Sequence, residues 1–216
     1  MSDYVDKLVA QEDDGPKVIP PFVDLSSIIL PGSLGECSVK HYHVSAMDAL
    51  RSGRSYPIFY SPPGGPYVVM HVGNTLMMSN TPMEQKTNLP FVNCATGHVL
   101  IAGLGIGLCL PPLLKNPLVQ KITVIELSSD VRDYILPRLQ QAFDCTKLEV
   151  VIADIFEYQP ERGTKFDTIW FDIWAEAHYD GPQVHRLKLK YRSRLNKENP
   201  RAWMGAWIES FRGMRG

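Results

Sequence analysis

The sequence lacks several features that mark common classes of protein. Its four cysteines are scattered without a CxxC pair, which argues against a zinc site and a disulfide framework and fits a reducing compartment. The acidic start, MSDYVDKLVAQEDDGPK, has no apolar core of the kind found in a secretory signal. The longest apolar run, from Val99, is broken by glycines and prolines well short of the ~20 residues that cross a bilayer. We therefore expect a cytoplasmic protein without a membrane span.

Neither the net charge nor the positions of the histidines indicate a special class of protein. The chain has 216 residues, is 44% hydrophobic and carries a formal net charge of −1, as expected for one domain or one domain with a small appendage. His41 and His43 would point the same way from a strand, but no third ligand is near them in the sequence. We expect no metal site.

The composition and periodicity of the sequence change twice along the chain. Residues 1–36 are rich in Pro, Gly and Asp and predict an irregular N-terminal arm. Residues 37–96 begin with short strand-like pieces (SVKHYHV, YPIFY, YVVMHV, TLMMS) between turn signals, which predict a small antiparallel β appendage. Over residues 97–216, apolar strands alternate with helical segments before a basic helical tail. This alternation predicts a doubly wound parallel α/β domain.

The run VLIAGLGIGLCL holds three glycines on alternate positions, Gly103, Gly105 and Gly107, directly after the first strand of the predicted parallel sheet. In such sheets ligands bind beyond the carboxyl ends of the strands, and glycines let a ligand approach the main chain closely. The alternative is that these glycines only allow the strand and the next helix to pack closely.

Carboxylates at the ends of the following strands favour the ligand-binding explanation. Glu126 ends KITVIE, where it could accept hydrogen bonds from ribose hydroxyls, and Asp154 ends EVVIAD, where it could meet an adenine amino group. Asp172 ends FDTIWFD. Because parallel strands end at one edge of the sheet, these side chains predict a nucleoside-binding cleft.

The spacing of the glycines discriminates among nucleoside ligands. A dinucleotide fingerprint requires glycine at the sixth position of GxGxxG, which is Leu108 here, and the chain has no GxxxxGK[ST] loop for a triphosphate. At this point the sequence resembles the class I S-adenosylmethionine-dependent methyltransferases, and among them the spermidine-synthase-like branch, with similarity to small bacteriophage-encoded members. The resemblance covers residues 75–174 and implies a Rossmann-like fold.

The resemblance also implies roles for individual residues. HVLIAGLGIG looks like the glycine motif, VIEL the ribose-binding acid, IADIFEY the adenine-contacting loop, and KFDTIWFD the catalytic strand. The stretch LMMSNTPMEQKTN looks like the strand and acidic segment that precede the domain. The implied contacts to S-adenosylmethionine or its decarboxylated form come from Gly103, Leu104, Gly105, Gly107, Glu126, Leu127, Asp154, Ile155 and Glu84.

Departures from the pattern bear on the reaction. Ile101 stands where methyltransferases often have an acid, Ile106 where aminopropyltransferases have the Asp of GGGDG, and Ala175 at the second place of their DxxD pair. We therefore rank transfer of a methyl group to an unidentified acceptor first and transfer of an aminopropyl group to a polyamine second. A third reading is an inactive nucleoside-binding or interaction protein. The candidate catalytic residues are Asp172, Glu176 and His178.

The end of the chain allows further partners. We expect a small-molecule acceptor, while the cationic segment 185–194 is either a solvated face or a contact for nucleic acid. Trp203, Trp207 and Phe211 fall at a helical spacing of four, and we expect this stripe to dock on the sheet. The strand-like pieces of the β appendage would also suit a homodimer.

Overall fold

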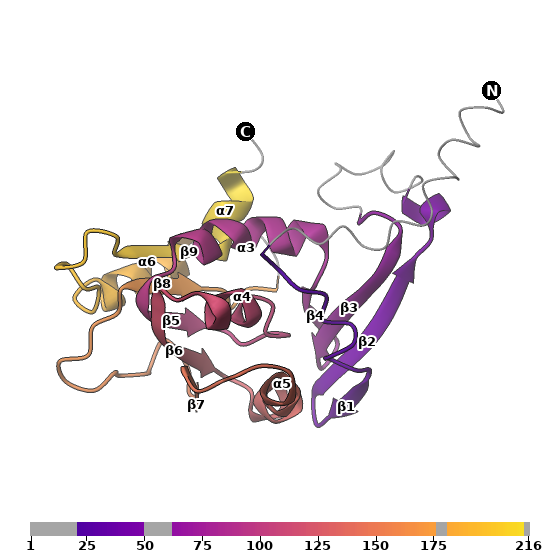
Figure 1. Cartoon of the computed structure of the whole chain (residues 1–216), viewed down its shortest axis with the longest axis horizontal. Coiled ribbons are helices and arrows are strands. Elements are labelled where there is room, and N and C mark those ends of the chain that lie inside the picture. Colours follow the sequence, from indigo (N-terminus) through magenta and orange to yellow (C-terminus); the bar gives the residue numbers. More distant parts are fainter. Residues whose placement is uncertain (1–20, 50–61, 176–180, 214–216) are drawn as a thin grey trace.

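The computed structural model describes residues 21–49, 62–175 and 181–213. These residues form an antiparallel sheet and a parallel sheet, and helices flank the parallel one (Figure 1). The predicted α/β class, with a separate antiparallel sheet toward the N-terminus, is thereby confirmed. The predicted strand YPIFY and the residues Glu176 and His178 lie outside the described part of the chain.

The antiparallel sheet has the order β1–β2–β3–β4. Its strands are β1 (Gly32–Leu34), β2 (Cys37–Val44), β3 (Gly65–Val72) and β4 (Thr75–Ser79). Cys37 and Val39 alternate with more exposed neighbours along β2, the period expected of a sheet with one covered face. Gly73, at φ +57°, makes the tight turn between β3 and β4.

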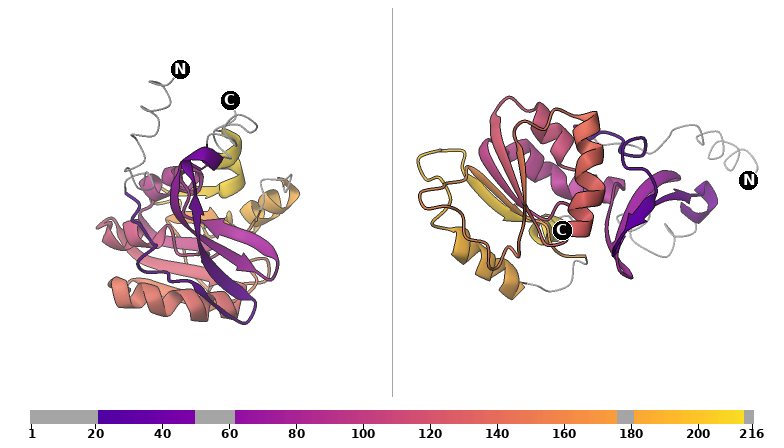
Figure 2. Two further views of the ribbon diagram at one scale, coloured as in Figure 1. Left: turned by 90° about the vertical axis from the view of Figure 1, so that its right-hand side faces the viewer. Right: turned by 90° about the horizontal axis from the view of Figure 1, so that it is seen from below.

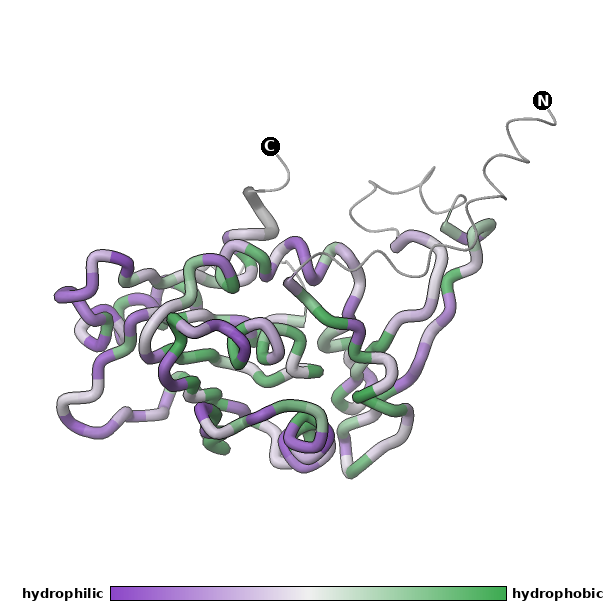
Figure 3. Tube along the Cα trace, in the orientation of Figure 1, coloured by the Kyte–Doolittle hydropathy of each residue, from purple (hydrophilic) through white to green (hydrophobic). Residues whose placement is uncertain are grey.

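The parallel sheet has the order β7–β6–β5–β8–β9. Its strands are β5 (Gly97–Ala102), β6 (Val119–Glu126), β7 (Leu148–Ile152), β8 (Thr168–Phe171) and β9 (Trp203–Ala206). The order reverses direction at β5, which places the topological switch point between β5 and β8. Figure 3 shows the hydrophobic stretches running through these central strands, as expected for strands covered on both faces.

Helices cover both faces of the parallel sheet. They are α3 (Pro82–Cys94), α4 (Leu110–Lys115), α5 (Ser129–Ala142), α6 (Gly181–Tyr191) and α7 (Trp207–Gly213). Neighbouring residues of β8 point to opposite faces: Trp170 stacks on Phe91 of α3 with ring centroids 5.1 Å apart, whereas Phe171 meets Tyr191 of α6. Helices α3 and α7 lie side by side (Figure 1).

Several predicted boundaries need correction. The segment 37–96, predicted as a β appendage, ends in α3, and this helix packs on the parallel sheet rather than on the antiparallel one. The segment 1–36, predicted to be irregular, contains β1 and the buried side chains of Leu25 and Ile29 in its described part.

The predicted aromatic stripe near the C-terminus is wrong as a helical feature. Trp203 opens the strand β9, and Trp207 opens the helix that follows it. Both still pack in the interior, because Trp203 stacks at 5.7 Å from Trp170 and Trp207 is buried. Spacing by four residues here spans a strand and a helix start rather than one helical face.

The antiparallel sheet lies beside α5 (Figure 2), and two hydrogen bonds join them. The amide of Glu36, in the β1–β2 turn, donates to Asp130 Oδ2 at 2.9 Å, and the Tyr134 hydroxyl donates to the carbonyl of Leu30 at 2.9 Å. These two contacts hold β1 and β2 beside α5 and so fix the antiparallel sheet next to the carboxyl edge of the parallel one. No helix of the described residues is long and apolar enough to cross a membrane.

Candidate active site

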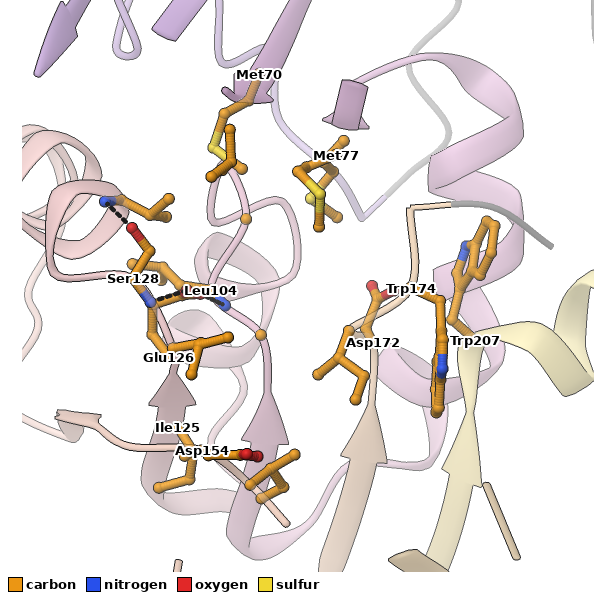
Figure 4. Close-up of a pocket in the computed structure, with 18 of the residues that line it drawn as sticks. Met70, Met77, Leu104, Ile125, Glu126, Ser128, Asp154, Asp172, Trp174 and Trp207 are labelled. Atoms are coloured by element: carbon orange, nitrogen blue, oxygen red, sulfur yellow. Dashed lines mark hydrogen bonds between the residues drawn. The ribbon is translucent and has the colours of Figure 1, made fainter. Parts of the chain in front are cut away.

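A cavity of about 500 Å³ lies between the carboxyl ends of β5, β6, β7 and β8 and the strands β3 and β4 (Figure 4). This volume falls in the range of about 300–1,000 Å³ that is usual for small-molecule sites. Its lining combines a few polar groups with a larger apolar share, and the acids among the described lining residues are Glu84, Glu126, Asp154 and Asp172. The three strand-end carboxylates predicted from the sequence therefore open on one cavity.

The glycine loop follows β5 and forms part of the cavity wall. Gly103, Gly105 and Gly107 all have positive φ values, +95°, +54° and +75°. A Cβ at Gly103 would collide with the carbonyl oxygen of Asp172, and one at Gly105 with the sulfur of Met78. Gly103 and Gly105 line the cavity while also serving close internal packing.

Gly107 differs from the other two glycines. A Cβ there would collide with the side chain of Leu139 in α5, and Gly107 is not among the residues that line the main cavity. Its role in this structure is close packing between the loop and a helix, which was the alternative reading of the glycine run.

Glu126 holds the glycine loop to the start of α5. One carboxylate oxygen accepts from the amide of Leu104 at 2.7 Å, and the other from the amide of Ser128 at 2.8 Å. Ser128 in turn caps α5 by accepting from the Val131 amide at 3.3 Å. The carboxylate is buried, yet it lines the cavity, and each oxygen keeps a second lone pair for a ligand hydroxyl.

Three residues predicted to contact the cofactor, Asp154, Ile155 and Leu127, line the cavity near the ends of β6 and β7. Asp154 follows β7, and its Oδ1 accepts from the Phe156 amide at 2.8 Å. Ile155 is buried, whereas Leu127 is 73% exposed at the cavity wall. An apolar side chain left open beside a cavity offers a flat ligand a contact surface.

Asp172 and Glu84 form an acidic pair at the other side of the cavity. Burial raises the pKa of Asp172 to about 7, against the opposing effect of hydrogen bonds from the Trp170 and Asn88 side chains. Burial together with the negative charge of Asp172 raises the pKa of Glu84 to about 8. Two carboxyl groups poised near neutrality in one cavity are typical of a site that binds cations or moves protons.

Asn88 of α3 stands behind this acidic pair. Its Oδ1 accepts from Trp170 Nε1 at 3.1 Å and from the Cys109 thiol at 3.3 Å, and its Nδ2 donates to the carbonyl of Glu84 at 3.0 Å. Asn88 is fully buried. A buried amide with its oxygen and nitrogen both engaged fixes the orientation of the groups around it.

The apolar part of the cavity was not predicted. Met70 and Met77 point into it from β3 and β4, and Trp174 and Trp207 lie next to Asp172 (Figure 4). The stretch TLMMS was predicted only as a strand, and its sequence shows no alternation that would have indicated a cavity face. Trp207 follows β9, a strand that the sequence did not reveal.

The cationic segment 185–194 is largely engaged in contacts within the chain. Lys188 Nζ lies 2.6 Å from Glu209 Oε1, Lys190 Nζ donates to the carbonyl of Phe156 at 2.6 Å, and Arg194 donates to the carbonyl of Glu161 at 3.0 Å. These three cations are engaged within the chain rather than forming a purely solvated face, and nothing in the described structure supports the nucleic-acid contact.

The fold and the cavity define a Rossmann-like domain with a cavity at the carboxyl edge of its parallel sheet, bordered by strands of the antiparallel sheet. The model of the spermine/spermidine synthase domain matches residues 73–193, more than half of the chain. The chain belongs to this family, and the predicted spermidine-synthase-like branch is confirmed.

Individual relatives agree with the family assignment. A polyamine aminopropyltransferase of Pyrobaculum arsenaticum is 40% identical over 86 residues, which cover 37% of this chain and 30% of that protein. Polyamine aminopropyltransferase 1 of Bacillus cereus is 35% identical over 118 residues, 53% of this chain and 42% of that protein. The matched segments thus span less than half the length of these relatives.

A solved structure, spermidine synthase from Thermotoga maritima, covers 78% of this chain and 53% of its own, at a TM-score of 0.47 and 20% identity. The names of the relatives favour the aminopropyl reading over methyl transfer, which was ranked first from the sequence. The bacteriophage origin stays a prediction.

Proposed function

We propose that this chain binds decarboxylated S-adenosylmethionine and transfers its aminopropyl group to an amine, releasing methylthioadenosine. The observation that carries the proposal is the acidic pair Glu84 and Asp172, which shares one cavity with the strand-end acids Glu126 and Asp154. Family membership supports transferase chemistry of this type.

The adenosine half of the donor fits the side of the cavity between β6 and β7. There Glu126 retains lone pairs for the ribose hydroxyls, Asp154 can accept from the adenine amino group, and Leu127 and Ile155 provide apolar contact. Leu104 and Gly105 complete this wall through the glycine loop.

The donor's amino group needs an acidic partner, and the aspartate of the family motif GGGDG is absent from this chain. Ile106 occupies the position of the aspartate in GGGDG and is fully buried in the core, so it offers that group no contact. We assign this role to Glu84, whose carboxyl lines the cavity beside Asp172. A bound ammonium group favours the ionised form of Glu84. The ionised Glu84 and Asp172 would both repel the carboxylate of S-adenosylmethionine, which favours the decarboxylated donor over a methyl donor.

Asp172 is assigned to the acceptor amine. A bound sulfonium supplies a carbon atom that is activated by the positively charged sulfur. The acceptor nitrogen forms a bond to this carbon, the carbon–sulfur bond breaks with its electron pair going to sulfur, and Asp172 takes the proton from the acceptor. A base with a pKa of about 7 is suited to this transfer near neutral pH. We expect kcat/KM to rise as the pH increases through about 7, because the ionised carboxylate is the active form.

Calorimetric titration tests the proposed donor. We expect decarboxylated S-adenosylmethionine to bind more tightly than S-adenosylmethionine, and Glu84→Gln to weaken it about tenfold, since one charge-assisted contact is lost. Methylthioadenosine lacks the aminopropyl group, so Glu84→Gln should leave its affinity unchanged.

A variant of the nucleoside half provides the complementary control. Glu126→Gln should weaken decarboxylated S-adenosylmethionine and methylthioadenosine to a similar extent, because both carry the same ribose. Equal binding of S-adenosylmethionine and its decarboxylated form, with no effect of Glu84→Gln, would contradict the assignment and return methyl transfer to first place.

A further inference from the structure

The acids among the described lining residues are few compared with the cations that a polyamine would bring. Among the described lining residues, Glu126 and Asp154 lie on the nucleoside side, and their oxygens already accept from backbone amides. Of the acids that the structure describes in the lining, Glu84 and Asp172 remain for the ammonium groups of donor and acceptor. If Glu84 holds the donor's amino group and Asp172 the reacting amine, the described wall offers no third acid to a second acceptor cation.

Much of the described cavity wall is apolar. Met70, Val72, Met77 and Met78 line it from β3 and β4, and Trp174 and Trp207 stand beside Asp172 (Figure 4). Both tryptophans are buried, and Met70 is 2% exposed. A charged group pressed against the methionine and valine side chains of this surface loses its hydration without gaining a partner, which is strongly unfavourable.

The same surface suits an uncharged substituent. Methionine side chains are flexible and polarisable, and they adapt to apolar groups of different shape. Aromatic rings next to a carboxylate also favour a single alkylammonium, through the attraction between a cation and a ring face. The region therefore combines one amine-binding carboxylate with an adaptable apolar compartment.

We infer that the acceptor is a monoamine with an apolar body, whose nitrogen lies at Asp172 and whose hydrocarbon part packs against the methionines of β3 and β4. This inference rests on the proposed aminopropyl transfer and names its acceptor class. The product would be the corresponding N-substituted propanediamine, formed with release of methylthioadenosine and one proton.

Two amines of matched size test the inference. Hexylamine and cadaverine have the same number of heavy atoms and differ only at one end, a methyl group in the first and an ammonium in the second. Protein saturated with methylthioadenosine is titrated with each amine. We expect hexylamine to bind about tenfold more tightly, because its far end is transferred to an apolar wall without desolvating a charge.

A designed acid on the wall should reverse this preference. Met77→Glu places a carboxylate on the cavity side of β4, and we expect it to strengthen cadaverine binding relative to hexylamine by about tenfold. Leu76→Glu is the matched control, since Leu76 neighbours Met77 on the same strand but is 50% exposed and does not line the cavity. The control should leave the ratio of the two affinities unchanged.

The outcomes separate this inference from the function on which it rests. Binding of methylthioadenosine together with equal or tighter binding of cadaverine, or with no binding of hexylamine, would overturn the acceptor class alone. If cadaverine binds more tightly, the double variant Glu176→Gln, Asp180→Asn shows whether these two acids bind its second ammonium. Loss of the preference in this variant would assign the second ammonium to them, and the monoamine proposal would be overturned in that case too. Failure of methylthioadenosine to bind would overturn the proposed function and the acceptor class with it.

Discussion

Glu126 is predicted to be a structural residue as much as a ligand-binding one, and Glu126→Gln tests this. The carboxylate accepts from the amides of Leu104 and Ser128 at 2.7 and 2.8 Å in a buried position. A glutamine keeps one acceptor oxygen but turns its NH₂ group toward the other amide. One buried N–H is then left facing a donor, which costs about 1–3 kcal/mol.

We therefore expect Glu126→Gln to lower the free energy of unfolding by about 2 kcal/mol. For a chain of this size the midpoint of thermal unfolding would fall by about 4–8 °C. Urea denaturation followed by circular dichroism gives the free energy, and an unchanged slope would show that the surface exposed on unfolding is the same.

Glu149→Gln is the matched control. Glu149 pairs with Lys121 at 2.8 Å, but both side chains are 52% exposed, so its loss should cost less than about 0.5 kcal/mol. If Glu126→Gln destabilises the protein no more than this control does, the reasoning that the carboxylate fastens the glycine loop to α5 is refuted.

Three further predictions concern the surroundings of the cavity. Burial raises the pKa of Glu84 to about 8 from an ordinary 4.5, so between these pH values the folded state retains a proton that the unfolded state has released. The free energy of unfolding should therefore fall as the pH rises through this range, and denaturation at several pH values should show a flatter slope for Glu84→Gln. Gly103→Ala should cost about 2–3 kcal/mol in the same assay, and Gly163→Ala, at φ +89° with open space around it, only about 1 kcal/mol. Asp130→Ala should speed hydrogen exchange of the Glu36 amide about fivefold or more.

The positions of the strand-end acids were predictable from the sequence because strand periodicity determines them. Once VLIAG, KITVIE, EVVIAD and FDTIWFD are recognised as parallel strands, their carboxyl ends must meet at one edge of the sheet. Glu126, Asp154 and Asp172 therefore share a cavity, as the structure shows. What periodicity could not reveal is that Glu126 already serves two backbone amides.

The other half of the cavity depends on contacts between distant segments. Met70 and Met77 belong to the antiparallel sheet, which hydrogen bonds at Asp130 and Tyr134 hold beside α5. No local pattern encodes such a docking. The strand β9 was missed for a related reason: WMGA is short, and its strand conformation depends on pairing with β8.

The glycine run illustrates the same limit. Its alternate spacing was compatible with ligand approach and with close packing, and the structure shows both at Gly103 and Gly105 but only close packing at Gly107. Gly103 and Gly105 line the cavity, whereas Gly107 makes room for Leu139. Which glycine serves which purpose depends on the neighbours that folding brings to each Cα.

The most direct test of the account is a transfer assay read by mass spectrometry. The protein is incubated with hexylamine or with cadaverine as the acceptor. Each acceptor is combined in one sample with decarboxylated S-adenosylmethionine and in another with S-adenosylmethionine, and Asp172→Asn is assayed in parallel. We predict an aminopropylated amine and methylthioadenosine from the decarboxylated donor only, with the product strongly reduced in Asp172→Asn. A methylated amine formed from S-adenosylmethionine, or no transfer of an aminopropyl group to hexylamine or cadaverine by protein that binds the donor, would contradict the account.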